Sequence, residues 1–188
     1  MNSTNTLVPV KFVIAILRGN SEIHRIRSML EQEIGSIEYC SKDYLFDQTN
    51  YYESEMGKEL VRSLISFSKL LPPDELVRLK LLTNLLESSH FSTSDGRRNA
   101  NLDVGYLDHN KIVLASMKGL GQKIYLGHGV YADMVARYKH GRYQPFEWSF
   151  PDFKDGRYDL DWLAIRQKYL EQLKLEKPMC AQNRGNFF

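Results

Sequence analysis

The chain is poor in cysteine and lacks a long apolar run. Its two cysteines, Cys40 and Cys180, belong to no C-x-x-C pair, so a disulfide framework and a cysteine-ligated zinc site are both excluded. The longest apolar stretch, residues 12–17, falls far short of the roughly 20 residues that a membrane helix needs. The polar start M-N-S-T-N-T-L does not resemble a secretory signal. We therefore expect a cytoplasmic protein with reduced thiols and no membrane contact.

The signature motifs of several enzyme classes are also missing. The sequence contains no G-x-x-x-x-G-K-[ST] phosphate loop, no G-x-S-x-G nucleophile elbow and no H-E-x-x-H zinc motif. These absences exclude a P-loop nucleotide hydrolase and leave no recognisable nucleophile and base. The net charge of +2 is too small to indicate a nucleic-acid partner. Local basic clusters at residues 97–98 and 137–142 are typical of solvated surface.

What is present is the composition of a folded domain. The chain is 43% hydrophobic and 26% charged, which excludes disorder over most of its length. A chain of 188 residues can bury a core without help from disulfides or metals. Because neither an internal repeat nor a low-complexity linker divides it, we predict one domain over residues 8–177, with flexible tails at 1–7 and 178–188.

Apolar periodicity predicts alternating strands and helices in the first part of the chain. Residues 8–17 are β-branched and apolar on both faces, as in a central strand. An apolar stripe over residues 23–34 predicts a helix that ends at Gly35. The next predicted elements are strands over residues 37–46 and 59–70, a helix over 74–88 and a strand over 99–107. This order is that of a ferredoxin-like β-α-β-β-α-β sandwich.

After residue 107 the pattern predicts an antiparallel extension that ends in a helix. Asp108 is placed to cap a short helix over residues 110–118. An amphipathic stripe predicts a last helix over residues 159–174. Between these helices we expect strands over residues 123–126, 130–138 and 142–148. The predicted fold class is therefore α+β, a ferredoxin-like sandwich with a C-terminal antiparallel β extension and a terminal helix.

Residues 130–138 admit two interpretations. Val130, Met134 and Tyr138 fall at spacings of four, as they would on one face of a helix. We favour a strand, because residues 139–141 predict a hairpin turn that lets this segment pair with the one that follows.

Five blocks of sequence resemble those of a known family. The blocks are T-N-Y-Y-E-S-E-M-G from Thr49, K-L-L-T-N-L-L-E from Lys80, N-L-D-V-G-Y-L from Asn101, K-I-Y-L-G-H-G-V-Y-A from Lys123 and W-S-F-P-D-F from Trp148. In this order, over roughly residues 10–158, they resemble an uncharacterised prokaryotic family, domain of unknown function 4416. The resemblance implies no established activity.

The chain departs from the family pattern at three places. It has Val104 where the family tends to have proline, and His128 where the family tends to have aspartate. Residues 148–153 stand where the family tends to have Trp-Thr-Tyr-Pro-Asp-Tyr. The first change loosens a turn expected before Gly105, and the second removes a carboxylate. Relatives have carried a GTP-binding label, but the missing phosphate loop excludes a P-loop GTPase here.

Several polar residues surround the predicted junction between a strand and the next helix. They are Asn101, Asp103, Tyr106 and Asp108. Carboxylates there could bind Mg²⁺ through oxygen, or act as a general base with Lys111 nearby. The structural alternative is a turn at Asp103 and a helix cap at Asp108. We favour the cap for Asp108 and leave both interpretations open for Asp103, which shares a strand face with Asn101.

Residues 127–132 match G-x-G-x-x-A after a predicted strand. A dinucleotide site is disfavoured, because a hairpin follows this segment rather than a βαβ unit. Gly127 and Gly129 instead predict a strand edge where a ligand can approach the backbone. His128 could act as an acid or base at neutral pH, although a loop histidine is more often merely exposed.

Three polar residues of the predicted strand over 130–138 would share one face. They are Tyr131, Asp133 and Arg137. Arg137 could then hold an anionic ligand, with Asp133 orienting it. The alternative, which we favour, is a surface ion pair worth under about 1 kcal/mol.

Two further segments also have alternative interpretations. Lys80, Asn84 and Glu87 form a polar stripe on an otherwise apolar helix. A buried stripe would need hydrogen-bond partners or a ligand, but we favour a stripe that faces solvent. Tyr51 and Tyr52 could stack on a base or sugar ring, or could anchor their loop to the core.

The function that these patterns favour is binding of a small phosphorylated or nucleotide-like ligand. This function could extend to metal-dependent chemistry, for which Mg²⁺ is the candidate metal. The expected roles are metal ligand or base for Asp103, ligand positioning for Asn101 and Tyr106, phosphate contact for Arg137, and secondary acid or phosphate contacts for Lys111 and His128. This hypothesis requires Asp103, Tyr131 and Arg137 to meet in one pocket. The alternative is a non-catalytic protein that binds a protein partner through exposed aromatic residues at 146–153, with no pocket behind them.

Overall fold

Nine strands and their connecting helices make up the described part of the computed structural model, which comprises residues 7–19, 23–49, 51–92 and 97–176. The predicted tails lie outside these residues, apart from Leu7. The strands are β1 (Lys11–Arg18), β2 (Ile37–Cys40), β3 (Tyr44–Leu45), β4 (Val61–Phe67), β5 (Ala100–Leu107), β6 (Lys111–Ser116), β7 (Ile124–Gly127), β8 (Val130–Lys139) and β9 (Arg142–Pro145). The helices are α1 (Ile23–Glu33), α2 (Glu53–Met56), α3 (Glu75–His90), α4 (Pro151–Lys154) and α5 (Asp159–Glu176).

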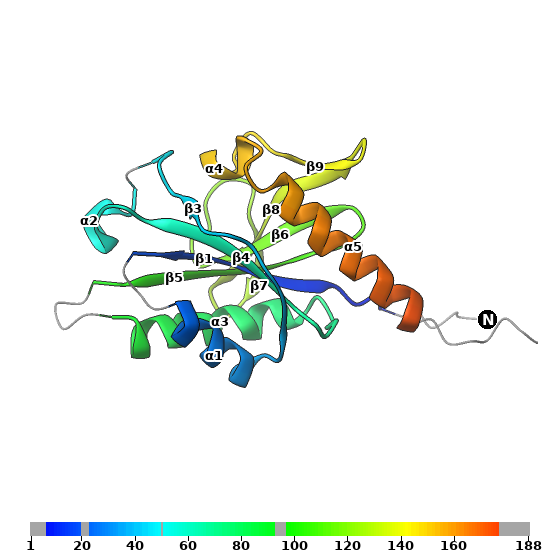
Figure 1. The fold of residues 1–188 in the computed structure, drawn as a ribbon, viewed down its shortest axis with the longest axis horizontal. Helices are drawn as coiled ribbons and strands as arrows, with labels where there is room; N and C mark the ends of the chain where they lie inside the picture. Colours follow the sequence, from blue (N-terminus) through cyan, green and yellow to red (C-terminus); the bar gives the residue numbers. More distant parts are fainter. Residues whose placement is uncertain (1–6, 20–22, 50, 93–96, 177–188) are drawn as a thin grey trace, which may run out of the picture.

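The strands form one antiparallel sheet that has helices on both faces (Figure 1). Their order is β2-β4-β1-β5-β6-β8-β7, with β3 beside β4 and β9 beside β8. Helices α1 and α3 pack on one face, and α5 packs on the other. Within the described residues, no helix is both long and apolar enough to cross a membrane.

Strand β1 is the central strand that its continuous apolar run predicts. It pairs with β4 on one side and with β5 on the other. Phe12 and Ile14 enter the core beneath α1 and α3, whereas Val13 and Ala15 enter the core beneath α5. Because successive side chains point to opposite faces, a strand between two helical layers must be apolar at every position.

The α+β class and the antiparallel extension are confirmed. The specific ferredoxin-like topology is not confirmed, because the sheet has nine strands. The extension does not form a separate layer, because β6, β8 and β7 continue the same sheet beyond β5.

The predicted short helix over residues 110–118 is wrong, because this segment forms β6. Asp108 caps no helix. Its carboxylate accepts hydrogen bonds from the backbone N–H groups of Asn110 (2.7 Å) and Lys111 (2.8 Å). These bonds close the tight turn between β5 and β6, a role that aspartate fills as readily as a helix cap.

The strand favoured for residues 130–138 is confirmed as β8. His140 (φ 51°) and Gly141 (φ 82°) form the hairpin turn to β9, and both have the left-handed backbone that a tight hairpin requires. The next strand is shorter than predicted, since β9 ends at Pro145 and residues 151–154 form α4. The strand predicted over residues 37–46 is divided into β2 and β3, which both pair with β4.

The sheet opens between β5 and β6. These strands pair only from Gly105 opposite Leu114 to Leu107 opposite Ile112, although β5 begins at Ala100 and β6 ends at Ser116. Gly105 is the last paired residue of β5 before the strands separate, and a Cβ atom there would lie 2.2 Å from the backbone oxygen of Val113. Glycine is therefore needed at the closest approach of the two strands.

We expect Gly105→Ala to destabilise the fold by about 1–3 kcal/mol, because the added methyl group must push β6 away from β5. Chemical denaturation of the purified variant measures this change. The matched control is Gly19→Ala, where the new Cβ would meet no atom closer than 3.5 Å. Equal effects at the two glycines would show that the contact at Gly105 does not constrain the sheet.

Candidate functional site

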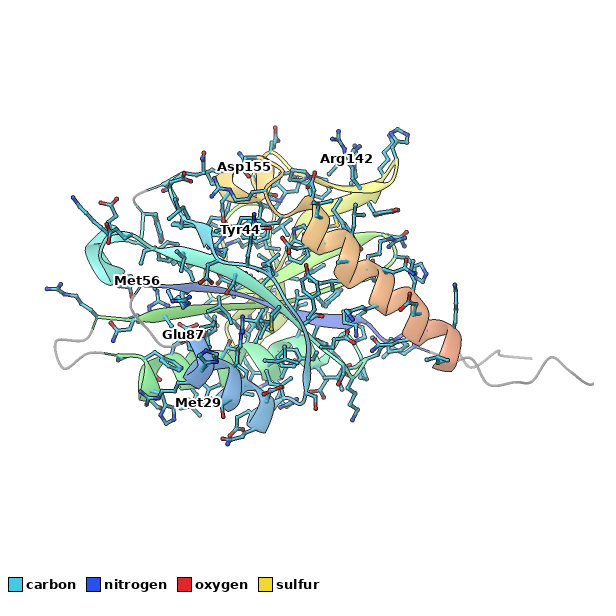
Figure 2. The ribbon with its side chains drawn as sticks, in the orientation of Figure 1. Met29, Tyr44, Met56, Glu87, Arg142 and Asp155 are labelled. Carbon is cyan, nitrogen blue, oxygen red and sulfur yellow. The ribbon has the colours of Figure 1, made fainter. Side chains whose placement is uncertain are left out.

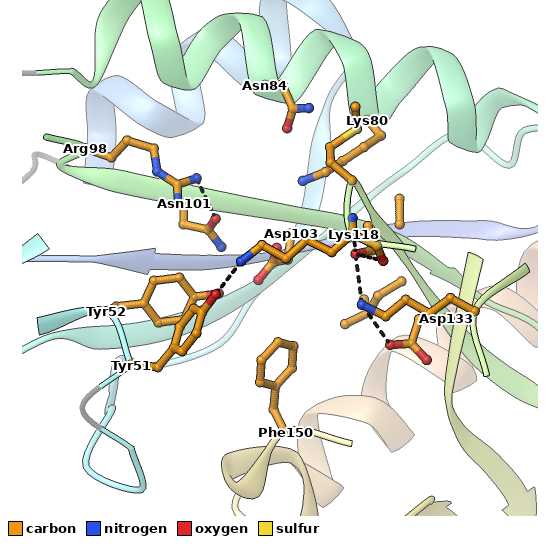
Figure 3. Close-up of a pocket in the computed structure, with 15 residues that line it drawn as sticks. Tyr51, Tyr52, Lys80, Asn84, Arg98, Asn101, Asp103, Lys118, Asp133 and Phe150 are labelled. Carbon is orange, nitrogen blue, oxygen red and sulfur yellow. Dashed lines mark hydrogen bonds and ion pairs between the residues drawn. The ribbon is translucent and has the colours of Figure 1, made fainter. Parts of the chain in front are cut away.

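A cavity of about 360 Å³ lies where β5 and β6 separate (Figure 3). Helix α3 contributes to its wall on one side, and the segments before α2 and α4 contribute on the other. Most of its polar side chains are charged: Lys80, Arg98, Asp103, Lys118, Lys123 and Asp133. The cavity therefore exists because the sheet opens, and charged groups occupy the opening.

Glu87 of α3 takes over a backbone contact that β6 does not make. Its Oε1 accepts a hydrogen bond from the backbone N–H of Leu102 (2.7 Å), and its Oε2 accepts one from Arg98 Nη1 (2.8 Å). Figure 2 shows Glu87 between α3 and the sheet. Burial raises the pKa of this carboxyl, while Lys80, the Leu102 N–H and Arg98 act to lower that pKa. Both oxygens are engaged, so Glu87 has a structural role.

Asn101 presents an unpaired donor at the cavity. Its Oδ1 accepts a hydrogen bond from Arg98 Nη1 (3.1 Å), which fixes the amide so that Nδ2 is the opposite end. The residue is only 5% exposed, and Nδ2 has no hydrogen-bond partner among the described residues. A buried amide N–H that lacks an acceptor carries a desolvation cost of about 1–3 kcal/mol. A ligand acceptor in the cavity would remove that cost.

Lys80 of α3 is a second buried donor at the same place. Its side chain lines the cavity and the residue is only 5% exposed. Within the described part of the chain it makes no hydrogen bond or ion pair, although it attracts Glu87 through space. The solvent-facing interpretation of the polar stripe is wrong, because Lys80 and Glu87 are both buried. Of the two, Glu87 has partners and Lys80 has none.

Arg98, in contrast, is fully engaged by carboxylates. Its Nε and Nη2 donate to the two oxygens of Glu55 (2.5 and 2.9 Å), in addition to the bond with Glu87. The Arg98 guanidinium lowers the pKa of the Glu55 carboxyl, and Glu55 in turn raises the pKa of Arg98. This bidentate pair ties α2 to the start of β5. Arg98 therefore shapes the cavity and is not available as a contact for an anion.

Asp103 faces the cavity with its carboxylate 17% exposed. The nearest cation is Arg62 Nη2, at 3.9 Å, which is too far for a direct hydrogen bond. Within the described residues the Asp103 carboxylate accepts no hydrogen bond. It is therefore free to accept one from a ligand.

Arg62 is a buried cation beside the cavity. Its Nη1 donates to Asp152 (2.6 Å), and both side chains are fully buried. The guanidinium carbon lies 4.7 Å from the ring centre of Phe46 and 5.4 Å from that of Phe153. Tyr158 also donates its hydroxyl to Asp152 (2.8 Å). These contacts hold Arg62 in place, so it provides a fixed positive charge next to Asp103.

The two tyrosines at residues 51–52 have different positions. Tyr52 is buried against Phe46, with ring centres 5.8 Å apart, and anchors its loop. Tyr51 is 58% exposed and lines the cavity, where its hydroxyl accepts a hydrogen bond from Lys118. Phe150 lines the same end of the cavity (Figure 3). Each of the two interpretations therefore fits one tyrosine: Tyr52 anchors its loop to the core, and Tyr51 is placed to stack on a ring in the cavity.

Asp133 lines the cavity but is already paired. It accepts a hydrogen bond from Gln122 Nε2 (2.7 Å), and Lys123 Nζ lies 3.8 Å from its carboxylate. Lys123 in turn donates to Ser116 (3.0 Å). This network closes one end of the cavity.

The predicted face shared by Asp133 and Arg137 is wrong, because β8 contains a bulge. Val113 pairs with Met134 and Ile112 with Ala136, so Val135 is an extra residue in β8. A bulge reverses the alternation of side chains beyond it. Arg137 is consequently exposed on the other face, and neither it nor Tyr131 lines the cavity.

Five other predicted site residues also lie away from the cavity. Tyr106 packs edge-on against Phe12 on the face covered by α1 and α3. Lys111 is paired with Asp108 at the opposite end of β6. The remaining three lie where β7 meets β8: Gly127 ends β7, and His128 and Gly129 form the turn. Of the predicted residues, the structure brings together Asn101, Asp103 and Asp133.

Nothing among the described residues forms a protein-only metal site. No group of three or more His, Cys, Asp or Glu side chains there could hold a metal ion. The carboxylate of Asp103 is one oxygen ligand group, and Mg²⁺ is commonly held by one or two carboxylates together with ligand phosphates and water. A metal at Asp103 would therefore depend on oxygen atoms from a ligand.

The aromatic segment at residues 146–153 is only partly exposed. Phe146 stacks on Trp148 with ring centres 4.6 Å apart, and the Trp148 indole donates to the backbone oxygen of Met134 (3.0 Å). Phe153 is buried against Arg62. Phe150 lines the cavity, so a pocket does adjoin this segment, contrary to what the partner-binding hypothesis requires.

Comparison with known proteins places the chain in a family. The family model described as Domain of unknown function (DUF4416) matches residues 8–169. The chain belongs to this family. No curated protein and no solved structure matches it. The DUF4416 match includes every cavity-lining residue described above, because all of them lie between Tyr51 and Phe150.

We expect Asp152→Ala to destabilise the protein by about 3–5 kcal/mol, because it leaves the Arg62 guanidinium buried without its anion. Chemical denaturation measures the loss. The matched control is Asp43→Ala, which removes the 44% exposed partner of Arg18 and should cost less than about 1 kcal/mol. Similar losses in the two variants would contradict this account of Arg62.

Lys80→Met should leave the protein as stable as before, or raise its free energy of unfolding by about 1 kcal/mol or more. Methionine fills a similar volume without a buried charge, and replacing buried charge by apolar packing is often stabilising. Glu87 keeps both of its hydrogen bonds in this variant. Thermal and chemical denaturation test the expectation. A loss of stability above about 1 kcal/mol would mean that Lys80 supports the fold itself.

Proposed function

We propose that the protein binds a small phosphorylated or nucleotide-like ligand in the cavity between β5 and β6. The observation that carries this proposal is a pair of donors that lack acceptors among the described residues: Asn101 Nδ2, which is a buried atom, and the ammonium group of Lys80, a residue that is only 5% exposed. Burying these donors away from water costs free energy, and an anion that accepts hydrogen bonds from both of them would offset that cost.

The balance of charge at the cavity supports an anionic ligand. Arg98 is held by Glu55 and Glu87, neither of which lines the cavity, and Lys123 faces Asp133. The side chains that line the cavity are therefore four cations, including Lys80 and Lys118, against the two carboxylates of Asp103 and Asp133. The charge of this lining favours an anion over a cation.

Asp103 contributes an acceptor to the same site. Its carboxylate is open to the cavity and could accept a hydrogen bond from a ligand hydroxyl. With phosphate oxygens present, it could also help to hold Mg²⁺. In this proposal Lys80 takes the phosphate-holding role that the sequence alone suggested for Arg137.

The strand order β2-β4-β1-β5, with α1 and α3 on one face, supports a ferredoxin-like interpretation of the first half of the sheet. The alternative function, partner binding through residues 148–153, has less support. Phe153 is buried and the Trp148 indole N–H is already used within the chain.

A thermal-shift scan of the full chain with nucleotides, sugar phosphates and inorganic phosphate, each with and without Mg²⁺, tests the proposal. At a concentration about 100 times its dissociation constant, a ligand stabilises the folded state by about 2.7 kcal/mol, which raises the melting temperature. We expect phosphorylated compounds to raise it and unphosphorylated sugars to leave it unchanged. The absence of a shift with every phosphorylated compound would contradict ligand binding at this cavity.

Asp103→Asn should reduce the part of the shift that depends on Mg²⁺, because the amide removes the anionic oxygen. Asp74→Asn is the matched control, since Asp74 is exposed at the start of α3 and makes no side-chain cap bond. If the Asp103 variant folds and keeps the full response to every ligand, Asp103 has no role in the site.

A further inference from the structure

We propose that the ligand is a single nucleoside monophosphate, with its phosphate between Lys80 and Asn101 and its base between Tyr51 and Phe150. This inference rests on the function proposed above and adds the identity of the chemical class and its orientation. It depends on the size of the cavity and on a separation of its lining into a donor end and an aromatic end.

The size of the cavity limits the ligand to one nucleotide. Ligand pockets commonly measure about 300–1,000 Å³. At about 360 Å³ this cavity lies near the lower limit. One base, one sugar and one phosphate are in keeping with that volume, whereas a dinucleotide would extend into solvent.

The donor end is suited to a phosphate. Lys80 provides a point charge with up to three N–H donors, and Asn101 provides its Nδ2 donors, each from a residue that is 5% exposed. Glu87 is nearby, but its two oxygens already accept hydrogen bonds from the Leu102 N–H and from Arg98. Glu87 therefore does not compete with a phosphate for the donors of Lys80 and Asn101. A dianionic phosphate would therefore accept hydrogen bonds from both Lys80 and Asn101.

The aromatic end is suited to a base. Tyr51 is 58% exposed and Phe150 is 37% exposed, and both line the cavity. Tyr52 supports Tyr51 edge-on, with ring centres 4.9 Å apart. Lys118 Nζ lies 4.9 Å from the centre of the Tyr51 ring and donates to the Tyr51 hydroxyl, which further restricts that ring. A planar base can stack on such a surface, whereas a sugar phosphate would leave it unoccupied.

Asp103 lies between the donor end and the aromatic end of the cavity (Figure 3). A carboxylate without a direct partner is the group that other nucleotide sites use to accept hydrogen bonds from ribose hydroxyls. The three parts of a nucleotide thus correspond to three groups of residues: donors, a carboxylate and rings.

Isothermal titration calorimetry on the full chain provides the test. The probes are the four ribonucleoside 5′-monophosphates, the corresponding nucleosides, ribose 5-phosphate and inorganic phosphate. We expect at least one monophosphate to bind about tenfold or more tightly than its nucleoside, than ribose 5-phosphate and than inorganic phosphate, because only the nucleotide uses both ends.

Two variants test the orientation. Lys80→Met should weaken monophosphate binding about tenfold or more and leave nucleoside binding unchanged, whereas Lys69→Met, at an exposed lysine outside the cavity, should change neither. Tyr51→Ala should weaken nucleotide and nucleoside alike by about tenfold and leave inorganic phosphate unaffected. Tyr125→Ala, an exposed tyrosine outside the cavity, is its control.

The failures of this inference and of the proposed function are distinguishable. If ribose 5-phosphate or inorganic phosphate binds as tightly as every monophosphate, the nucleotide class is overturned while binding of a phosphorylated ligand stands. If monophosphates bind but the folded Lys80 and Tyr51 variants bind them like the wild type, the orientation is overturned. If no phosphorylated probe binds, the proposed function fails together with this inference.

Discussion

The opening between β5 and β6 is the constraint on which the rest of the site depends. In a continuous sheet, β6 would accept the backbone hydrogen bonds of β5, and a buried N–H without a partner is too costly to leave. Glu87 supplies the missing acceptor for Leu102, which requires α3 to place a carboxylate inside the protein. That carboxylate in turn binds Arg98, and Arg98 fixes the amide of Asn101. One gap in a strand pairing thus determines the positions of three polar side chains.

The two arginines near the cavity are paired with carboxylates, whereas Lys80 and Lys118 are not. Arg62 and Arg98 are each held by carboxylates, through Asp152 and through Glu55 with Glu87, so they connect elements that are distant in sequence. The planar guanidinium suits this task because it can satisfy two carboxylates at once. A lysine ammonium that is not paired with a carboxylate can instead bind an incoming anion. The arginines therefore set the shape of the cavity, and Lys80 and Lys118 set its charge.

The sequence predicts those features that depend on a repeating pattern. The apolar run of β1 and the alternation that puts Asn101 and Asp103 side by side both follow from a period of two. The position of Arg137 could not be predicted, because the one-residue bulge at Val135 leaves no clear mark in the sequence and reverses every side chain after it. The stripe on α3 shows another limit: periodicity groups Lys80 with Glu87 but does not say which face is buried. The sequence predicts a helix where β6 lies, because an aspartate such as Asp108 can cap a helix as readily as it closes a hairpin turn.

Lys80 can nevertheless be recognised as unusual once the structure is known. Three of the six buried positions of α3 are leucines that lie in the core, Leu76, Leu79 and Leu86, whereas Lys80 is a buried cation. A methionine or leucine at position 80 would fit that core without the cost of burying an ammonium group. Charged residues at buried helix positions occur chiefly where function requires them. The buried Lys80 has no compensating hydrogen bond or ion pair within the described residues. The same holds for Asn101 Nδ2 on the strand opposite. These two departures meet at one opening in the sheet, where a single bound anion would accept hydrogen bonds from both donors.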